Sequence, residues 1–543
     1  MRERYGQRGP VGREGRDRLM AGSVTPGAAD IGEATSVVHA FIGRHVDSGG
    51  GSAVAIRTPG GSISYGELRA LVNRTGNALR ALGLQPEQRV AMAVADGIEF
   101  AAIFFGAISI GAVAVPLSTR LTASEYRTVL RDSRAKAIVS EAAIAPILDE
   151  IRDDLPHLGA TLVVGGDHAG WQRFEALVAA ESSGLREEPM SLDEMAFWLY
   201  TSGTTGQPKA AVHARRTLLA CRQYGVEVLG ASKETRVLAT SKLFFAYALS
   251  TALLIPLYVG GQTFLHPSWP DVSTTVATIR EFQPTLFFSV PTFYSRLLRA
   301  DLPPETFASV KLCVSAGERL PEEIYNSFER RFGVPILDGI GATEAIFIFI
   351  SNRPDRRRPG SSGVEVPGTD ARISSPDGAE VAPGEPGVLW VRSPSAALGY
   401  WNRVDLTRRV FNGDWYRTGD VFSKDVEGFY HHLGREDDYF KVAGLWVSPA
   451  ALERAALQHP DVAEAGAIGT EDEHGLVKPV VFVVAKDPGA VAPTFLTELD
   501  ALIAAKVEPH QRPRRIVLVP ELPRTATGKL QRFKLQAMAR AGA

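Results

Sequence analysis

The first third of the chain alternates between two kinds of apolar spacing. In YGELRALVNRTGNALRALG the apolar side chains fall three or four positions apart, which predicts an amphipathic helix. The buried face of that helix would comprise Leu68, Leu71, Val72, Thr75, Leu79 and Leu82. The next apolar run, RVAMAVAD at Arg89 to Asp96, is short and continuous, as in a buried strand. This alternation continues to Val290 and predicts a layered α/β domain with largely parallel strands.

One apolar segment is long enough to raise the question of a membrane span. FAAIFFGAISIGAVAVPL, Phe100 to Leu117, reaches the minimum length of about 18 residues. Two glycines, a serine and Pro116 interrupt it. A buried helix that leads into a short strand, AVAVP, explains the segment better than a span.

The pattern changes near Gly434, where the polar run REDD leads into YFKVAGLWVSPAALERAAL. A strand (PVVFVVAK), a helix around Leu499 and a final strand (RIVLVP) follow, which together describe an α+β unit of about a hundred residues, an ordinary domain size. We therefore expect four parts: a tail at 1–30, a large N-terminal domain at 31–434, a hinge at 435–438 and a small C-terminal domain at 439–543.

Charge and cysteine content exclude several classes of protein. A net charge of −2 over 543 residues argues against a nucleic acid or an anionic membrane as partner. Cys221 and Cys313 lie far apart in apolar surroundings, which predicts buried thiols in a reducing, cytoplasmic compartment rather than a disulfide or metal site. The arginine-rich first thirty residues lack the apolar core of a secretory signal; they read as a flexible tail, or as sequence upstream of a true start at Met20. The charged stretch NRPDRRRPGSSG (352–363) reads as a solvated loop, with contact to an anion as the alternative.

Three glycine-bearing turns follow short apolar strands: WLY-TSGTTG, KLCV-SAGE and PIL-DGIGATE. Ligands of open α/β sheets bind outside the carboxyl ends of the strands, so these turns should converge on one rim as a nucleotide site. The first does not match the P-loop pattern, yet Thr201 to Thr205 can cradle phosphate oxygens and Lys209 adds a positive charge. Glu344, directly after Thr343, is either an oxygen ligand for Mg²⁺ or a helix-start carboxylate, and spacing alone leaves the two equal.

Five ordered motifs between about Gly61 and Leu535 together resemble the adenylate-forming superfamily: YTSGTTGQPKAAVH, DGIGATE, YRTGD, LGREDDYFKVAGLWVSP and LPRTATGKLQR. Within that superfamily, SKLFFAYAL, SVPTFYSRLL and ILDGIGATE are most similar to benzoate-CoA and related aryl-CoA ligases. The resemblance implies a large α/β domain with mostly parallel sheets and a small mobile α+β domain. It also implies a two-step reaction with ATP, Mg²⁺ and coenzyme A: a carboxylate attacks the α-phosphate to give an acyl-adenylate and pyrophosphate, and a thiol then displaces AMP.

The resemblance assigns roles to individual positions. Thr343 would touch the α-phosphate, Glu344 would hold Mg²⁺, and Lys529 in TATGKLQR would be the catalytic lysine of the first step, where a fixed ammonium can stabilise the charge that develops on the reacting phosphate. Without the motif, Lys529 would read as an ordinary surface lysine. The implied ATP and AMP contacts are Thr201, Ser202, Gly203, Thr204, Thr205, Lys209, Ser315, Ala316, Gly317, Asp338, Gly339, Ile340, Gly341, Asp420 and Arg435. The small domain would turn about Asp437 and bring the thiol-tunnel residues into place, namely Lys441, Gly444 and Trp446.

The motifs FFAYALS and GATEAIFIF are where the resemblance places the acid. The implied lining is Phe245, Ala246, Tyr247, Gly341, Ala345, Ile346 and Phe347, with plain core packing as the alternative for each. Amino-acid-activating relatives have an aspartate where this chain has Phe245, so a buried ammonium would lack a counter-charge, at a cost of several kcal/mol. Benzoate ligases have a histidine in place of Phe347 and a bulkier residue in place of Ala345. We therefore expect an acid that is larger or more lipophilic than benzoate: a substituted aryl acid, or a bulky alicyclic or terpenoid one.

The acyl acceptor has two candidates at this level. Coenzyme A is favoured because the thiol-side motif is intact through Gly444 and no carrier domain follows it. The alternative is transfer to a carrier protein or a partner ligase. Because both Glu344 and Lys529 are present, a protein that only binds nucleotide is disfavoured. The oligomeric state is left open between a monomer and a homodimer.

Overall fold

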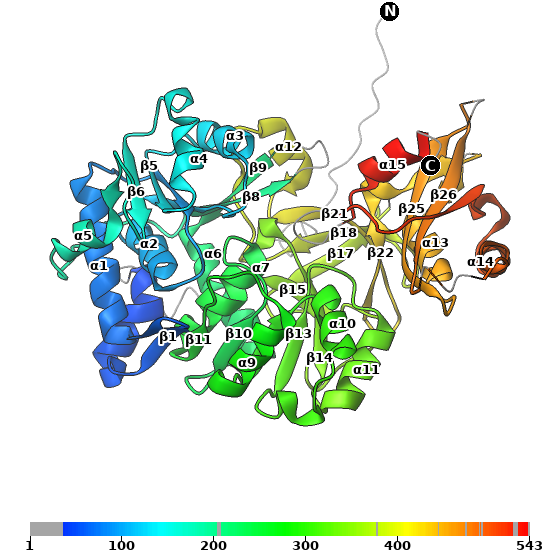
Figure 1. Ribbon diagram of the computed structural model, residues 1–543, viewed down its shortest axis with the longest axis horizontal. Coiled ribbons are helices and arrows are strands. Elements are labelled where there is room, and N and C mark those ends of the chain that lie inside the picture. Colours follow the sequence, from blue (N-terminus) through cyan, green and yellow to red (C-terminus); the bar gives the residue numbers. More distant parts are fainter. Residues whose placement is uncertain are drawn as a thin grey trace, which may run out of the picture.

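The computed structural model describes residues 36–202, 208–375, 378–443, 445–472, 475–487, 489, 492–524 and 530–540 (Figure 1). The N-terminal part contains two large sheets, and the C-terminal part forms a smaller body at one end of the molecule (Figure 1). This is the predicted α/β architecture of a large domain with mostly parallel sheets and a small second domain.

The first large sheet carries the candidate site. In the described residues it has nine strands, parallel from β14 through to β1 and antiparallel at both edges. In spatial order the strands are β16 (Val364–Glu365), β15 (Ile348–Ser351), β14 (Ile336–Gly341), β13 (Leu312–Ser315), β12 (Leu286–Ser289), β10 (Arg236–Ala239), β11 (Gln262–Phe264), β1 (Val54–Thr58) and β2 (Gly61–Ser64).

The second large sheet ends in an antiparallel hairpin that flanks the site. Its described strands number eight, and those from β8 to β7 run parallel. In spatial order they are β19 (Gly399–Tyr400), β9 (Pro208–Ala214), β8 (Met195–Ser202), β4 (Val113–Pro116), β3 (Arg89–Ala93), β5 (Ala137–Glu141), β6 (Ala160–Val164) and β7 (Gln172–Arg173).

Helices α1 (Tyr65–Ala81) and α2 (Ile98–Ser109) show how the sequence pattern becomes structure. Ser64 and Glu67 form a capping box that starts α1. Of the predicted apolar face, Leu68, Val72, Thr75 and Leu79 are buried, whereas Leu71 and Leu82 are half-buried. From Phe100 to its end, α2 is buried and leads to β4, so the segment considered as a span is a core helix followed by a strand. The other N-terminal α-helices are α3 (Ala123–Ser133), α4 (Ala145–Asp149), α5 (Phe174–Ala179), α6 (Arg215–Leu219), α7 (Ala246–Ala248), α8 (Ile255–Val259), α9 (Val272–Phe282), α10 (Pro291–Arg299), α11 (Glu322–Phe332) and α12 (Val404–Val410).

A third sheet connects the large sheets to the C-terminal body. It is antiparallel and comprises β17 (Asp370–Ser374), β18 (Gly387–Arg392), β21 (Trp415–Lys424), β20 (Phe411–Asn412) and β22 (Tyr430–Arg435). The C-terminal body has its own apolar clusters. Its elements are the hairpin β23 (Phe440–Val442) and β24 (Leu445–Val447), the strands β25 (Val462–Glu471), β26 (Val477–Ala485) and β27 (Arg515–Leu518), and the helices α13 (Pro449–Ala456), α14 (Phe495–Ala504) and α15 (Arg532–Arg540).

Smaller features also bear on the sequence predictions. Both cysteines are buried free thiols. Across the described ranges, the helices are all too short or too polar to cross a bilayer. The arginine-rich loop is bonded within the chain, because Arg357 pairs with Glu329 at 3.0 Å and Arg358 with Asp425 at 2.5 Å. The tail predicted at 1–30 lies outside the described residues.

Candidate active site

Two of the three glycine-bearing turns meet at one edge of the nine-stranded sheet. Ser289 and Ser315 end β12 and β13, and Asp338 is the register partner of Ser315 on β14, which continues to Gly341. Ser315 opens the SAGE turn, in which Ala316 is buried and Gly317 adopts a φ of 87°, a conformation that favours glycine. Parallel pairing therefore places the SAGE and DGIGATE segments side by side. The TSGTTG turn follows β8 of the other large sheet, so the prediction that all three turns lie at the edge of one sheet holds for two of them.

Asp338 is a buried carboxylate with spare hydrogen-bonding capacity. Its Oδ1 has no hydrogen-bond partner within the described residues, and the same holds for the Ser315 hydroxyl. Burial raises the pKa of Asp338 well above its ordinary value, and the Arg319 guanidinium offsets this only in part. Because an unpaired buried polar group is costly, the pair fits a site that is completed by a ligand with a donor group.

The DGIGATE strand must lie close to the next strand. A Cβ at Gly339 would come within 2.9 Å of the Ile350 carbonyl oxygen, and one at Gly341 within 3.0 Å of the Phe347 carbonyl oxygen. Ile340, between them, pairs with Ile350 of β15. The two glycines are therefore needed for backbone approach, independently of any contact with nucleotide.

Glu344 is the centre of a buried polar cluster. It lies in the short turn Thr343–Ala345 and is 8% exposed. Its Oε1 is 3.2 Å from Lys209 Nζ and accepts a hydrogen bond from the Tyr400 hydroxyl at 2.5 Å. Its Oε2 accepts from the Tyr416 hydroxyl at 3.3 Å. Burial alone would raise the pKa of Glu344, but the Lys209 ammonium and the Tyr400 hydroxyl outweigh it and hold that pKa below its ordinary value.

Tyr400 was not predicted from the sequence, because it lies outside all of the family motifs. It bridges the cluster, because Lys209 Nζ donates to its hydroxyl at 2.7 Å. Strand pairing accounts for its position: β19 runs antiparallel to β9, the strand that carries Lys209. Tyr400 and Glu344 are separated by 56 residues, so local spacing carries no signal for this contact.

His213 was also missed, although it ends the quoted motif YTSGTTGQPKAAVH. Its Nε2 donates to the Thr343 carbonyl at 2.8 Å, and its ring stacks on Phe197 with the centroids 4.7 Å apart. Burial lowers the pKa of His213 to about 4, so the ring is neutral near pH 7. His213 therefore supports the Thr343–Glu344 turn as a neutral hydrogen-bond donor.

The hairpin of β8 and β9 carries the TSGTTGQPK segment. Thr201 pairs with Lys209, and Ser202 with Pro208, at the open end of this hairpin. The tip, with Gly203, Thr204 and Thr205, lies outside the described residues. The structure thus fixes both ends of the loop and places Lys209 against Glu344.

Asp420 lies on β21 beside the same cluster. Arg435 of β22 pairs with it at 3.1 Å, and His432 Nε2 lies 3.5 Å from the same oxygen. Burial opposes ionisation, but the hydrogen bond from His432 and the charge of Arg435 keep the pKa of Asp420 below its ordinary value. Tyr416, on the same strand, links this pair to Glu344.

The candidate acid-binding residues come from two segments. The Tyr247 hydroxyl donates to the carbonyls of Ser289 and Val314, at 3.2 and 3.0 Å, so Tyr247 lies at the same rim as Asp338. Ala246 is buried at the start of α7, and Phe245, which caps that helix, is half-buried with its ring 4.1 Å from that of Phe244.

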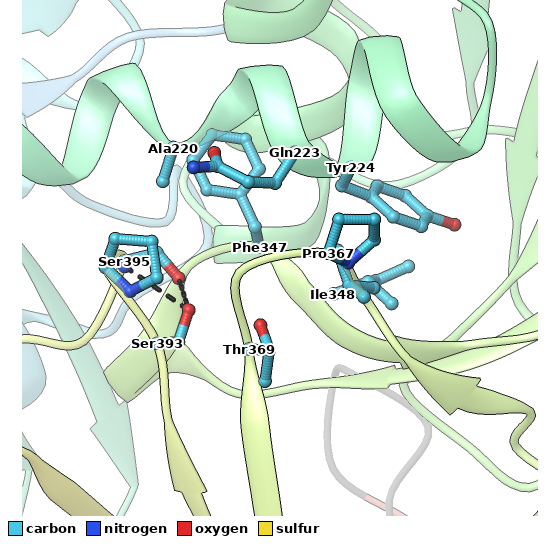
Figure 2. A pocket seen from close by; sticks show the side chains of 11 residues that line it. Ala220, Gln223, Tyr224, Phe347, Ile348, Pro367, Thr369, Ser393 and Ser395 are labelled. Carbon is cyan, nitrogen blue, oxygen red and sulfur yellow. Dashed lines mark hydrogen bonds between the residues drawn. The ribbon is translucent and has the colours of Figure 1, made fainter. Parts of the chain in front are cut away.

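The second segment turns sharply after Glu344. Ala345, Ile346 and Phe347 are at most 3% exposed. Ile346 has a φ of 46°, which is strained for a β-branched residue, and strain of this kind concentrates at functional sites. Phe347 then lines a small pocket beneath the helical segment at 220–224 (Figure 2).

The predicted thiol-side residues lie on the C-terminal body. Asp437 is exposed in the turn Glu436–Asp438. The residues on either side of it form ion pairs with different domains. Glu436 bonds Arg417 of β21, whereas Asp438 bonds Arg532 of α15. The hairpin β23–β24 presents Lys441 and Trp446, the ammonium lying 4.6 Å from the centre of the indole ring. Gly444 and Lys529 lie outside the described residues.

Comparison with known proteins adds to this geometry. The family model of AMP-binding enzymes matches residues 44–401 of this chain, and the family model of the AMP-binding enzyme C-terminal domain matches residues 451–529. The benzoate–CoA ligase of Thauera aromatica is 40% identical over 95% of this chain and 98% of its own. The 4-hydroxybenzoate–CoA/benzoate–CoA ligase of Rhodopseudomonas palustris is 39% identical over 92% and 94%. The crystal structure of an anthranilate CoA ligase in complex with anthranoyl-AMP superposes with a TM-score of 0.88 at 35% identity, covering 95% of this chain and all of the other.

Proposed function

Because this chain belongs to the AMP-binding enzyme family, we propose that it activates an aryl carboxylic acid as an acyl-adenylate and passes the acyl group to coenzyme A. The family resemblance that its motifs suggested is confirmed, and with it the adenylate-forming enzyme fold. The chain is an ATP-dependent acid–thiol ligase of the acyl/aryl-CoA synthetase type. The aryl acid itself, the acceptor and the individual residue roles are proposals.

The observation that carries the proposal is the convergence of the motif turns on one buried rim. Asp338 offers a free acceptor beside Ser315. Asp420, paired with Arg435 of β22, lies on β21, the strand that reaches Glu344 through Tyr416. In the proposed roles, Asp338 accepts from the amino group of adenine and Asp420 accepts from the ribose hydroxyls. Thr343, at the turn between them, contacts the α-phosphate.

Glu344 and Lys209 fit a metal–phosphate site. Mg²⁺ in nucleotide sites is held by one or two carboxylates together with phosphate oxygens and water, and a single ionised Glu344 meets that need. The ion would neutralise phosphate charge. We propose that Lys209 leaves Glu344 when nucleotide arrives and pairs with the departing pyrophosphate, so that the buried carboxylate keeps a cationic partner throughout.

The acid would lie against Ala246, Tyr247 and Phe347, with Lys529 delivered to the reacting phosphate by the small domain. The Tyr247 hydroxyl is hydrogen-bonded to two backbone carbonyls. Tyr247 therefore offers the acid an aromatic surface rather than a polar group. This supports an apolar, ring-bearing acid. An acid larger or more lipophilic than benzoate is proposed from the sequence departures at Ala345 and Phe347.

A pyrophosphate-release screen tests the proposal. Aryl, alicyclic, terpenoid and fatty acids are each assayed with ATP and Mg²⁺, with and without coenzyme A. We expect release to be greatest with aryl acids and to continue over many turnovers only when coenzyme A is present. Equal release with fatty acids would contradict the aryl assignment. A lack of stimulation by coenzyme A would favour a carrier protein or a partner ligase as acceptor.

A further inference from the structure

Asp132, in the last turn of α3, joins two segments that are far apart in the sequence. Its Oδ2 accepts a hydrogen bond from the Tyr200 hydroxyl at 2.8 Å, and its Oδ1 accepts one from Arg403 Nη2 at 3.1 Å. Its backbone carbonyl accepts from the Trp401 indole N–H at 3.0 Å. The Asp132 side chain is 14% exposed, so these interactions are formed largely out of water. Asp132 has none of the roles proposed above.

The two segments flank β9, the strand that carries Lys209. The strand order at this edge of the sheet is β19, β9, β8; Tyr200 lies on β8, and Trp401 directly follows β19. Tyr200 pairs with Ala210 of β9, and the Trp401 backbone N–H donates to the carbonyl of the same Ala210 at 3.0 Å. Asp132 therefore holds β9 through both of its neighbours.

The two faces of this edge of the sheet carry different groups. Successive side chains of a strand point to opposite faces. Tyr200 and Trp401 pack in the apolar cluster that α3 also joins. Lys209 and Tyr400, one position along their strands, point to the other face, where both contact Glu344. The contacts of Asp132 on one face thus fix the backbone that presents Lys209 and Tyr400 on the other.

The hydrogen bond between Tyr200 and Asp132 has a defined direction. Burial and the Asp132 charge raise the pKa of Tyr200 well above its ordinary value, so the hydroxyl stays protonated and donates. Hydrogen bonds to an ionised acceptor are stronger than those between neutral groups. The Arg403 guanidinium faces the other carboxylate oxygen. Removal of the Asp132 charge would therefore weaken its hold on both flanking strands at once.

We propose that Asp132 is a positioning residue for the binding of Mg²⁺-ATP. It acts through β8 and β19, which it holds so that Lys209 and Tyr400 meet at Glu344. The inference rests on the proposed function, in which Glu344 holds Mg²⁺. The proposed acid-binding residues lie on other segments, 245–247 and 345–347, so the effect of Asp132 should fall on Mg²⁺-ATP and not on the acid.

Steady-state pyrophosphate release separates this role from a general loss of stability, because one assay gives the half-saturating concentrations of both Mg²⁺-ATP and the acid. Asp132→Asn keeps the shape of the side chain and removes its charge. We expect it to raise the half-saturating concentration of Mg²⁺-ATP about fivefold, less than for the direct loss of a hydrogen bond to a charged group. The half-saturating concentration of the acid should not change.

Asp149→Asn is the matched control. Asp149 of α4 also accepts two side-chain hydrogen bonds, from His168 Nε2 at 2.6 Å and from Trp171 Nε1 at 2.9 Å. Trp171 directly precedes β7, which forms the opposite edge of the same sheet. Thermal unfolding measures the stability that each variant loses, and only Asp132→Asn should change the half-saturating concentration of Mg²⁺-ATP.

Tyr200→Phe is a second variant, which keeps the ring and the Asp132 charge and removes one hydroxyl. It should raise the half-saturating concentration of Mg²⁺-ATP in the same direction but by less. If that concentration stays at the wild-type value in both variants, or rises together with that of the acid, this inference alone is overturned. Absence of release from the unaltered protein with every aryl acid would overturn the proposed function and this inference with it.

Discussion

The rim of the large domain and the β23–β24 hairpin of the small domain are built in opposite ways. At the rim, Glu344 is 8% exposed and its charge is met by Lys209. On the hairpin, Leu445 and Trp446 are 53% and 55% exposed. In the proposed roles, the groups that would act on a charged nucleotide are held in place beforehand, whereas the exposed aromatic and aliphatic surface of the hairpin is of the kind that a ligand or another surface covers. The contrast matches a reaction in which the rim serves the first half-reaction and the hairpin is brought in for the second.

The largest effect is expected at Lys529, the positive charge that the small domain would supply to the first half-reaction. Lys529→Ala should slow pyrophosphate release by about 10³-fold, because the ammonium would stabilise charge that develops on the reacting phosphate. ATP binding, measured at equilibrium, should change little. Lys534→Ala, an exposed lysine on the neighbouring helix α15, is the control. Unchanged adenylation in Lys529→Ala would remove the lysine from the mechanism.

The burial of His213 predicts that the stability of the large domain depends on pH. The folded pKa of His213 is about 4, against 6.5 when unfolded, so between these values the unfolded chain binds a proton that the folded chain does not. Stability of the large domain should therefore fall as pH drops from about 6.5 to about 4, by at most about 3 kcal/mol. The measurement is the unfolding midpoint as a function of pH. His213→Phe, which keeps a ring against Phe197, should reduce the slope between pH 6.5 and pH 4; the part that remains includes His45 and His266, whose pKa values burial also lowers. An identical slope would contradict the assignment.

A bulky side chain on the β23–β24 hairpin should impair thioester formation and leave adenylate formation intact. Gly444→Trp is expected to reduce thioester formation by about 10²-fold, because the thiol can no longer approach correctly, while adenylate formation continues. Val426→Trp, at an 89% exposed position in the large domain, controls for the added ring. Equal loss of both half-reactions would count against the tunnel role.

The smallest effect concerns how the rim holds its carboxylate. Tyr400→Phe removes the 2.5 Å hydrogen bond to Glu344 and should raise the half-saturating Mg²⁺ concentration about tenfold, the usual size for a hydrogen bond to a charged group. Tyr416→Phe removes a longer contact, 3.3 Å, and should produce a smaller shift. A purely structural role for Tyr400 would lower activity without moving the Mg²⁺ dependence.

The sequence predicted the elements that carry strong periodicity and the turns that carry motifs. The amphipathic character of α1 and the burial of α2 were predicted from the local spacing of apolar residues alone. Convergence of SAGE with DGIGATE followed from the rule that ligands gather at strand ends. Tyr400 and His213 could not be predicted in this way. The pairing of β19 with β9 brings Tyr400 to the site, and His213 contacts the site through the backbone carbonyl of Thr343.

A single-turnover experiment tests the central claim most directly. The protein is mixed with ATP, Mg²⁺ and an aryl acid accepted in the screen, first without coenzyme A, and bound acyl-adenylate is quantified; coenzyme A is then added. The account predicts about one acyl-adenylate per active chain, which coenzyme A discharges to a thioester with release of AMP. No adenylate from any aryl acid, or an adenylate that coenzyme A leaves intact, would contradict it.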